Sequence, residues 1–171
     1  MELEKAKAIA EDFKKQLSPS CQRIEIAGSI RRRKPEPKDV ELLCIPRYRG
    51  SVNLLDSQIT MLMGEGVLAL RRNKRGSTAY GPKNKLLVHV ESGIGIDVFS
   101  TTEECWWVAL CVRTGPKDSN IAIAKAAQRR GWRLLAYGSG FSAPGGLLRC
   151  DSERDVFELV GLPYKEPWDR R

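Results

Sequence analysis

The sequence predicts an α+β protein, in which a mixed or antiparallel sheet with flanking helices is followed by a small second α/β lobe. Two kinds of pattern carry this prediction. Apolar residues recur at helical spacing over residues 2–17 and 117–130, and they alternate with polar residues or run continuously over residues 23–27, 39–45 and 85–99. A chain of 171 residues, 42% hydrophobic and 29% charged, is long enough for one compact domain or two small lobes with a core.

The first part of the chain is expected to form a helix and then a strand. Residues 2–17 have the helical periodicity, and Ser18-Pro19-Ser20 ends it. Residues 23–27 alternate polar with apolar side chains, which predicts a strand that runs into Gly28-Ser29. The Gly-Ser turn is therefore expected in a loop at the end of a strand.

The middle of the chain is expected to bring acidic side chains onto the sheet. Residues 39–45 form the second expected strand, and Asp39 and Glu41 point to one face of it because side chains alternate along a strand. Residues 85–99 predict a hairpin that brings Asp97 onto the same sheet. Carboxylates placed in this way can share a metal ion.

The remaining elements follow from the same rules. Helices are expected over residues 53–63, 103–112, 117–130 and 152–160, and short strands over residues 132–137 and 146–149. Ser152 with Asp155 three residues later is typical of a capping box at the last helix. The boundary between the two lobes is expected near residues 111–116, where sheet gives way to helix.

The chain is strongly basic. Its 29 Lys+Arg against 21 Asp+Glu give a net charge of +8, and the excess falls in clusters at residues 31–34, 71–75, 129–133 and 170–171. One such cluster is commonly a solvated face, but four on a basic chain indicate a polyanionic partner such as nucleic acid.

Several other kinds of site are disfavoured. The five cysteines are odd in number and form no CxxC pair, which argues against a zinc site and a disulfide framework. The single histidine, His89, excludes a two-histidine metal site, and a structural role in its expected strand is favoured. No apolar leader and no membrane-spanning run is present, so a cytoplasmic or otherwise intracellular protein is expected, neither secreted nor bound to a membrane.

Two features together point to nucleotidyl transfer. Gly28-Ser29 stands beside the basic residues 31–33, and such a turn can hold a triphosphate. Asp39, Glu41 and Asp97, on neighbouring strands, can hold the Mg²⁺ ions that phosphoryl or nucleotidyl transfer requires.

Four segments, taken in order, carry a more specific signal: Gly28-Ser29-Ile30-Arg31-Arg32, Asp39-Val40-Glu41, Ile96-Asp97-Val98-Phe99, and residues 151–157 continued at residues 161–170. Together they resemble the family X DNA polymerases, the group of DNA polymerase β, over nearly the whole chain. Residues 113–120 also resemble the family's Thr-Gly-Ser…Phe-Asn segment. The Gly-Ser turn with spaced acids is shared with the wider nucleotidyltransferase superfamily, whereas the carboxy-terminal run resembles the polymerase thumb in particular.

This resemblance implies a nucleotidyltransferase palm over residues 1–111 and a thumb-like lobe over residues 112–171. It implies a DNA-directed DNA polymerase that transfers dNMP from a dNTP to a primer 3′-hydroxyl by a two-metal mechanism, in short-patch repair or gap filling. Asp39, Glu41 and Asp97 are then the ligands of two Mg²⁺ ions, for which Mn²⁺ can substitute. The expected partners are a primer-template or gapped DNA and a dNTP, and the protein is expected to be a monomer.

Two further sets of residues are expected to bind the substrates. The nucleotide-binding set comprises Gly28, Ser29, Arg32, Lys38, Thr114, Gly115 and Asn120. The DNA-binding set comes from the basic clusters and comprises Arg71, Arg72, Lys74, Arg75, Arg129, Arg130 and Arg133. Because no lyase domain or helix-hairpin-helix precedes residue 1, these clusters are expected to provide much of the DNA grip, which predicts weak, salt-sensitive and distributive synthesis.

The sequence departs from the family pattern in several places. Glu41 stands where polymerase β-type enzymes have an aspartate, which keeps the charge, moves the carboxylate by about one bond length and bears on metal preference. Val112-Arg113 replaces an aromatic pair that resembles a sugar-selecting element, so weaker discrimination against ribonucleotides is expected. In the opposing interpretation, Val112 packs in the helix end and Arg113 points to solvent. Gly95 lies where a basic residue helps to orient the third acid, and Pro116 replaces a serine.

Two alternatives remain open from the sequence. A nucleotidyltransferase that modifies RNA, protein or a small molecule can be built on the same palm. A non-catalytic nucleic-acid-binding module that keeps the fold is the alternative of another class, and the intact acids Asp39, Glu41 and Asp97 argue against it. Primer extension with Mg²⁺ or Mn²⁺ and all four dNTPs discriminates all three.

Overall fold

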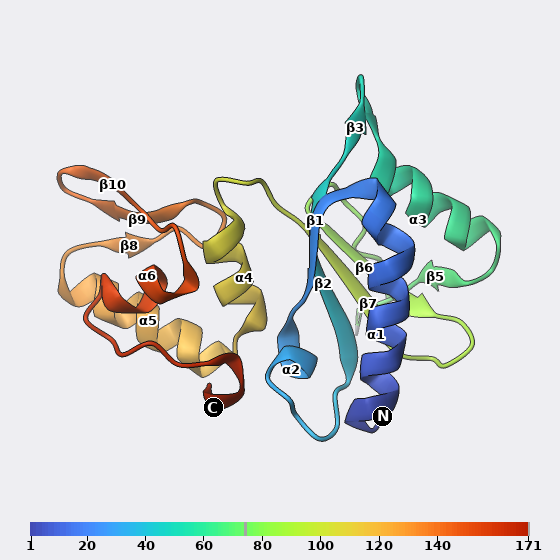
Figure 1. Ribbon diagram of the computed structural model, residues 1–171, viewed down its shortest axis with the longest axis horizontal. Helices are drawn as coiled ribbons and strands as arrows, with labels where there is room; N and C mark the ends of the chain where they lie inside the picture. Colours follow the sequence, from blue (N-terminus) through green and yellow to red (C-terminus); the bar gives the residue numbers. More distant parts are fainter. Residues whose placement is uncertain (74, 171) are drawn as a thin grey trace.

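A five-stranded mixed sheet forms the centre of the first lobe (Figure 1). The computed structural model describes residues 1–73 and 75–170. The strands follow the order β1-β2-β7-β6-β5, with bounds β1 Cys21–Ile26, β2 Asp39–Pro46, β7 Gly95–Ser100, β6 Asn84–His89 and β5 Leu68–Leu70. Only the β2–β7 pair within this sheet is parallel, so the predicted mixed sheet is confirmed.

The two faces of this sheet are covered differently. Helices α1 (Leu3–Leu17) and α3 (Leu54–Gly64) bury the apolar side chains of one face, among them Val40, Leu42, Ile96 and Val98. The short 3₁₀ helix η1 (Ser18–Ser20) links α1 to β1. Alternation along β2 and β7 therefore leaves residues 39, 41 and 97 on the opposite face, where α2 (Gly28–Arg31) follows β1.

The second lobe is built on a smaller sheet. Its strands β8 (Arg133–Leu134), β9 (Gly140–Ala143) and β10 (Gly146–Arg149) are antiparallel and lie in the order β10-β9-β8. Helices α5 (Lys117–Arg129) and α6 (Glu153–Glu158) pack with them around a separate core that includes Ile123, Phe141, Val156 and Phe157. The chain ends through a 3₁₀ helix, η2 (Pro167–Asp169).

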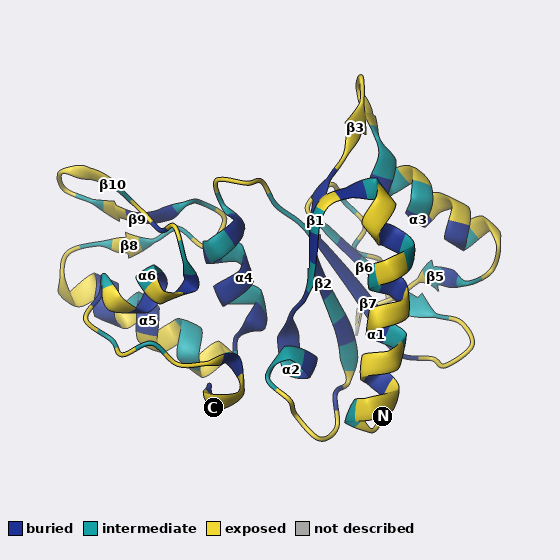
Figure 2. Ribbon diagram, in the orientation of Figure 1, coloured by how far each residue is buried: buried dark blue, intermediate teal, exposed yellow. Residues whose placement is uncertain are grey.

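Helix α4 (Trp106–Thr114) belongs to both lobes. Trp106 and Leu110 pack on Leu43 and Phe99 of the first sheet, whereas Val108 and Cys111 of the same helix belong to the core of the second lobe. Figure 2 shows α4 buried along much of its length between the two lobes. Strands β3 (Tyr48–Arg49) and β4 (Val52–Asn53) form a hairpin that projects from the top of the first lobe in this view with mostly exposed residues (Figures 1 and 2).

Some sequence-based boundaries were wrong. The helix expected over residues 103–112 begins at Trp106 and continues to Thr114, because residues 103–105 form a turn. The strand expected over residues 132–137 contains only Arg133–Leu134.

Strand β9 was missed entirely, because residues 138–146 are rich in glycine and serine. The structure gives a reason for the glycine at position 140. A Cβ atom there would lie 1.8 Å from the carbonyl oxygen of Leu148, so only glycine allows β10 to approach this closely.

The capping box at α6 is formed with one change. Ser152 Oγ accepts a hydrogen bond from the Asp155 N–H at 3.1 Å, as predicted. The Asp155 carboxylate accepts its own bond from the N–H of Asp151 at 2.8 Å, one residue before the expected donor. The five cysteines are free, and no helix in the described part of the chain is long and apolar enough to cross a membrane.

Candidate active site

Three carboxylates meet on the open face of the large sheet. The parallel register of β2 and β7 sets Asp39 opposite Gly95 and Glu41 opposite Asp97. One oxygen from each of Asp39, Glu41 and Asp97 lies within 4.8 Å of the others, which is the spacing of a shared metal site. The backbone thus places these acids on one face of neighbouring strands, as the sequence predicts.

Burial and mutual repulsion perturb these acids. Burial, followed by the charges of Asp39 and Asp97, raises the pKa of Glu41 to about 7. Burial also raises the pKa of Asp97 to about 6, although the neighbouring Arg71 guanidinium opposes that rise. Hard oxygen ligands that repel one another fit a divalent cation such as Mg²⁺ or Mn²⁺, because the cation offsets the negative charge.

A cavity of about 400 Å³ lies directly beside the acids. Ser29, Arg32 and Lys38 line it together with Asp39 and Glu41. The Oγ atom of Ser29 and the Nε atom of Arg32 are buried and have no hydrogen-bond partner among the described residues, so the protein itself leaves their hydrogen-bonding capacity unused. The predicted triphosphate residues therefore converge beside the predicted metal ligands.

Gly28 makes this close arrangement possible. Its φ is +62°, and a Cβ atom at this position would lie 2.2 Å from Oε2 of Glu41. Gly28 and Ser29 open the short helix α2, where a strand-end loop was expected. Glycine is therefore required both by the backbone conformation and by the approach of the Glu41 carboxylate.

The arginines of residues 31–33 have separate roles. Arg31 donates two hydrogen bonds to the Glu153 carboxylate, at 2.9 and 2.7 Å, and a third to Thr114 Oγ1 at 2.7 Å. Arg33 stacks on the Trp168 ring, with its guanidinium carbon 3.9 Å from the ring centroid. Of these three arginines, Arg32 alone lines the cavity, where Lys34 of the same basic cluster also lies, so Arg31 and Arg33 serve as contacts with the second lobe.

The remaining nucleotide-binding candidates come from the connection between α4 and α5. Arg32 donates to the backbone carbonyl of Thr114, which brings Thr114 and Gly115 beside the Gly-Ser turn. Asn120 donates its amide N–H to the carbonyl of Val112 at 2.8 Å, and its own Oδ1 has no partner. Asn120 is therefore held in place with one acceptor unused.

The expected DNA-binding residues are not equivalent. Arg71 forms an ion pair with Asp97, with 2.6 Å between Nη2 and Oδ1. The other members of the set are exposed: Arg72, Arg75, Arg129, Arg130 and Arg133. Lys74 lies outside the described residues. His89 hydrogen bonds to Ser92 Oγ at 2.7 Å and packs its ring edge-to-face on Phe13, in keeping with a structural role.

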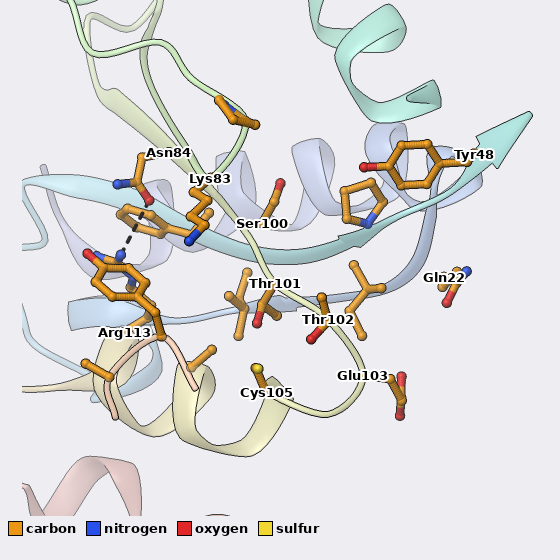
Figure 3. A pocket seen from close by; sticks show the side chains of 18 residues that line it. Gln22, Tyr48, Lys83, Asn84, Ser100, Thr101, Thr102, Glu103, Cys105 and Arg113 are labelled. Carbon is orange, nitrogen blue, oxygen red and sulfur yellow. Dashed lines mark hydrogen bonds between the residues drawn. The ribbon is translucent and has the colours of Figure 1, made fainter. Parts of the chain in front are cut away.

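A larger cavity of about 520 Å³ lies between residues of the two lobes, at the carboxyl ends of β2 and β7 (Figure 3). Arg113 lies against it, with its guanidinium carbon 3.8 Å from the centroid of Phe99 and a hydrogen bond of 3.4 Å to Asn84 Oδ1 (Figure 3). In the opposing interpretation Arg113 points to solvent, but its half-buried side chain contacts Phe99 and Asn84, whereas Val112 packs against the core of the second lobe as that interpretation expects. Nothing in the sequence pattern marks this cavity, since residues distant along the chain line it.

Comparisons with known proteins agree with this geometry. Residues 109–171 match the family model of the DNA polymerase beta thumb. Over 161 residues, 93% of this chain, the sequence is 27% identical to DNA polymerase/3'-5' exonuclease PolX of Bacillus subtilis (strain 168), and the chain spans 26% of the length of that relative.

Solved structures show the same fold. The chain superposes on Leishmania infantum polymerase beta in a ternary P/T complex with a TM-score of 0.78 and 20% identity, covering 100% of this chain and 76% of that one. For the ternary gap complex of the same protein, the TM-score is 0.82 at 18% identity, covering 99% of this chain and 70% of the other.

Proposed function

Since the chain resembles the family X DNA polymerases in its fold and carries their thumb, we propose that it is a DNA-directed DNA polymerase. It transfers dNMP from a dNTP to a primer 3′-hydroxyl and fills short gaps in DNA. The observation that carries this proposal is the convergence of Asp39, Glu41 and Asp97 within 4.8 Å of one another, beside a cavity lined by Ser29 and Arg32.

The residues divide into two groups by role. Ser29 and Arg32 bind the triphosphate, because both residues line the cavity beside the acids and the guanidinium of Arg32 brings a positive charge. Lys38 adds a positive charge at the edge of the same cavity. Asn120 is not among the residues that line this cavity, so its contact with the incoming nucleotide is proposed from the family resemblance alone. The nucleotide is thereby oriented before reaction, which lowers the entropic part of the barrier.

The acids form the second group. Asp39, Glu41 and Asp97 would hold two divalent cations, and these ions would lower the pKa of the attacking hydroxyl and neutralise charge on the triphosphate and on the pyrophosphate that leaves. The resemblance to the family X polymerases assigns Asp97 to the ion that would activate the primer 3′-hydroxyl, and we propose its carboxylate as the acceptor of the hydroxyl proton. Glu41 carries the same charge as an aspartate on a longer stem, so its reach determines which cation fits best.

Primer extension tests this proposal directly. The full chain is incubated with primer-template or single-nucleotide-gapped DNA, Mg²⁺ or Mn²⁺, and all four dNTPs. We expect template-directed extension that Asp97→Asn removes almost completely while the fold persists, because this change deletes a charge and a metal ligand at nearly constant shape. Asp12→Asn, on the exposed face of α1, is the matched control.

Other outcomes favour the alternatives. Near wild-type extension by a folded Asp97→Asn protein would exclude the proposed site. Labelling of RNA, protein or a small molecule without DNA extension would indicate another nucleotidyltransferase on the same fold. Binding of DNA with no transfer to any acceptor would indicate a non-catalytic module.

A further inference from the structure

Four positions form a square on the open face of the large sheet. Asp39 pairs with Gly95 and Glu41 with Asp97 across the parallel β2–β7 ladder, so all four positions lie on the same face of the sheet. Three corners carry carboxylates, and the fourth is a glycine with no side chain. The backbone conformation does not explain this glycine, because Gly95 lies within β7 and its φ is not positive.

The guanidinium of Arg71 occupies the empty corner. A Cβ atom built on Gly95 would lie 1.8 Å from Nη1 of Arg71 and 3.4 Å from Cβ of Asp39. The other guanidinium nitrogen, Nη2, lies 2.6 Å from Oδ1 of Asp97. Arg71 follows β5 and is fixed at its backbone by a hydrogen bond from its N–H to the carbonyl of Leu86 at 3.1 Å.

We propose that Arg71 is a positioning residue for the third acid and that Gly95 provides the space it needs. Arg71 holds Oδ1 of Asp97 and thereby directs the other carboxylate oxygen to the metal. The guanidinium lies over Gly95 with Nη1 and reaches Asp97 with Nη2, and a single ammonium nitrogen cannot occupy both places. This inference rests on the proposed function, in which Asp97 is a metal ligand.

The same contact removes Arg71 from the DNA-binding set. Its side chain is 30% exposed and its charge faces a carboxylate that is 10% exposed. Arg72, the next residue, is exposed and donates only to the carbonyl of Gly76 at 3.1 Å among the described residues. Neighbouring arginines of one cluster are thus assigned different tasks.

Mn²⁺ binding to the full chain without DNA tests the assignment. Free Mn²⁺ is measured by electron paramagnetic resonance during titration of the wild type, Arg71→Ala, Arg71→Lys and Gly95→Ala. Because residues that orient metal ligands typically contribute about 10- to 100-fold in affinity or activity, we expect Mn²⁺ affinity to fall by about that factor in all three variants. Arg72→Ala removes the same charge one residue away and is expected to bind Mn²⁺ like the wild type.

Gly95→Ala is expected to displace the Arg71 guanidinium without removing its charge. Its new methyl group meets the end of one flexible side chain, so the protein is expected to fold while Arg71 is displaced. If both changes act on one contact, Arg71→Ala combined with Gly95→Ala should weaken Mn²⁺ binding no more than either single change. If Gly95→Ala fails to fold, Mn²⁺ binding to Arg71→Ala and Arg71→Lys still tests whether Arg71 positions Asp97.

Two results would overturn the assignment. One is Mn²⁺ affinity in Arg71→Ala and Gly95→Ala equal to that of the wild type. The other is a loss in Arg71→Ala confined to DNA affinity, with the same flattened salt dependence as in Arg72→Ala. Failure of the proposed function is a distinct result: absence of primer extension by the wild type, with Mn²⁺ binding still weakened by the Arg71 and Gly95 changes.

Discussion

Glu153 is the carboxylate that joins the two lobes, and its replacement by glutamine removes the charge while keeping the shape. Its Oε1 accepts hydrogen bonds from Arg31 and Arg170, both at 2.9 Å, and its Oε2 accepts a second bond from Arg31 at 2.7 Å. The carboxylate side chain is 6% exposed, that of Arg31 is 22% exposed, and that of Arg170 is fully buried. Glu153→Gln therefore leaves two largely buried guanidinium groups without their counter-charge.

The expected cost is large relative to the stability of the protein. Removing one partner of a buried ion pair costs about 3–5 kcal/mol, because the remaining charge stays desolvated. A domain of this size is stable by about 5–15 kcal/mol, so a substantial part of the free energy of unfolding is lost. At about 2–4 °C per kcal/mol, Tm should fall by about 6–20 °C.

Urea and thermal unfolding of Glu153→Gln against the wild type measure this loss. The control is Glu158→Gln on the same helix, where an exposed pair with Arg154 at 2.9 Å contributes little. A decrease for Glu153→Gln no larger than that of the control would refute the reasoning.

The contact of Glu153 with Arg31 and Arg170 also predicts how stability changes with pH. Burial acts to raise the pKa of Glu153, but the hydrogen bonds and charges of Arg31 and then Arg170 outweigh it, and the pKa lies below its ordinary value. A carboxyl with a lowered pKa stabilises the fold above its unfolded pKa and loses this effect as pH falls through the folded pKa. The difference in stability between wild type and Glu153→Gln should therefore shrink in acid.

Three further predictions concern the active site and DNA. Mn²⁺ affinity should rise with pH through about 7, because burial and the adjacent carboxylates raise the pKa of Glu41 to about 7 and the group must lose its proton to ligate a metal; titration of Glu41→Gln should lose the rise near pH 7 and keep only the dependence near pH 6, because the pKa of Asp97 is raised to about 6. Replacing Arg129 and Arg130 by alanine should flatten the slope of log DNA affinity against log salt by roughly 0.9 per lost phosphate contact, and an unchanged slope would exclude both as DNA ligands. Since Val112 and Arg113 supply no aromatic pair, the ratio of kcat/KM for a dNTP and its rNTP should stay below about 10⁴, and a larger ratio in single-nucleotide insertion would contradict this expectation.

The three acids could be predicted from the sequence because each step depends on local geometry. Alternation along one strand puts Asp39 and Glu41 on one face, and a short hairpin brings the strand of Asp97 onto the same sheet. The Gly-Ser turn at the end of β1 then lies beside them, since β1 and β2 are adjacent strands. No knowledge of how the lobes pack is needed for any of this.

The partners of the arginines could not be predicted in this way. Arg31 and Glu153 are 122 residues apart, and Arg71 reaches Asp97 from a different connection of the sheet. A run of basic residues indicates charge on a surface, but the carboxylate that each guanidinium meets depends on tertiary packing. Residues 31–33 were therefore interpreted as one basic patch, although Arg31 and Arg33 contact the second lobe and Arg32 lines the cavity.

The short helix α2 and the two residues after it contact both the cavity and the second lobe. Within residues 29–33, which include the end of α2, Ser29 and Arg32 line the cavity, while Arg31 and Arg33 contact Glu153 and Trp168 of the second lobe. Arg32 also donates to the carbonyl of Thr114, so the cavity wall and the end of α4 are bound to each other. Because these four residues lie within one five-residue stretch, a shift of this stretch would alter both the wall of the cavity beside the acids and the contacts with the second lobe.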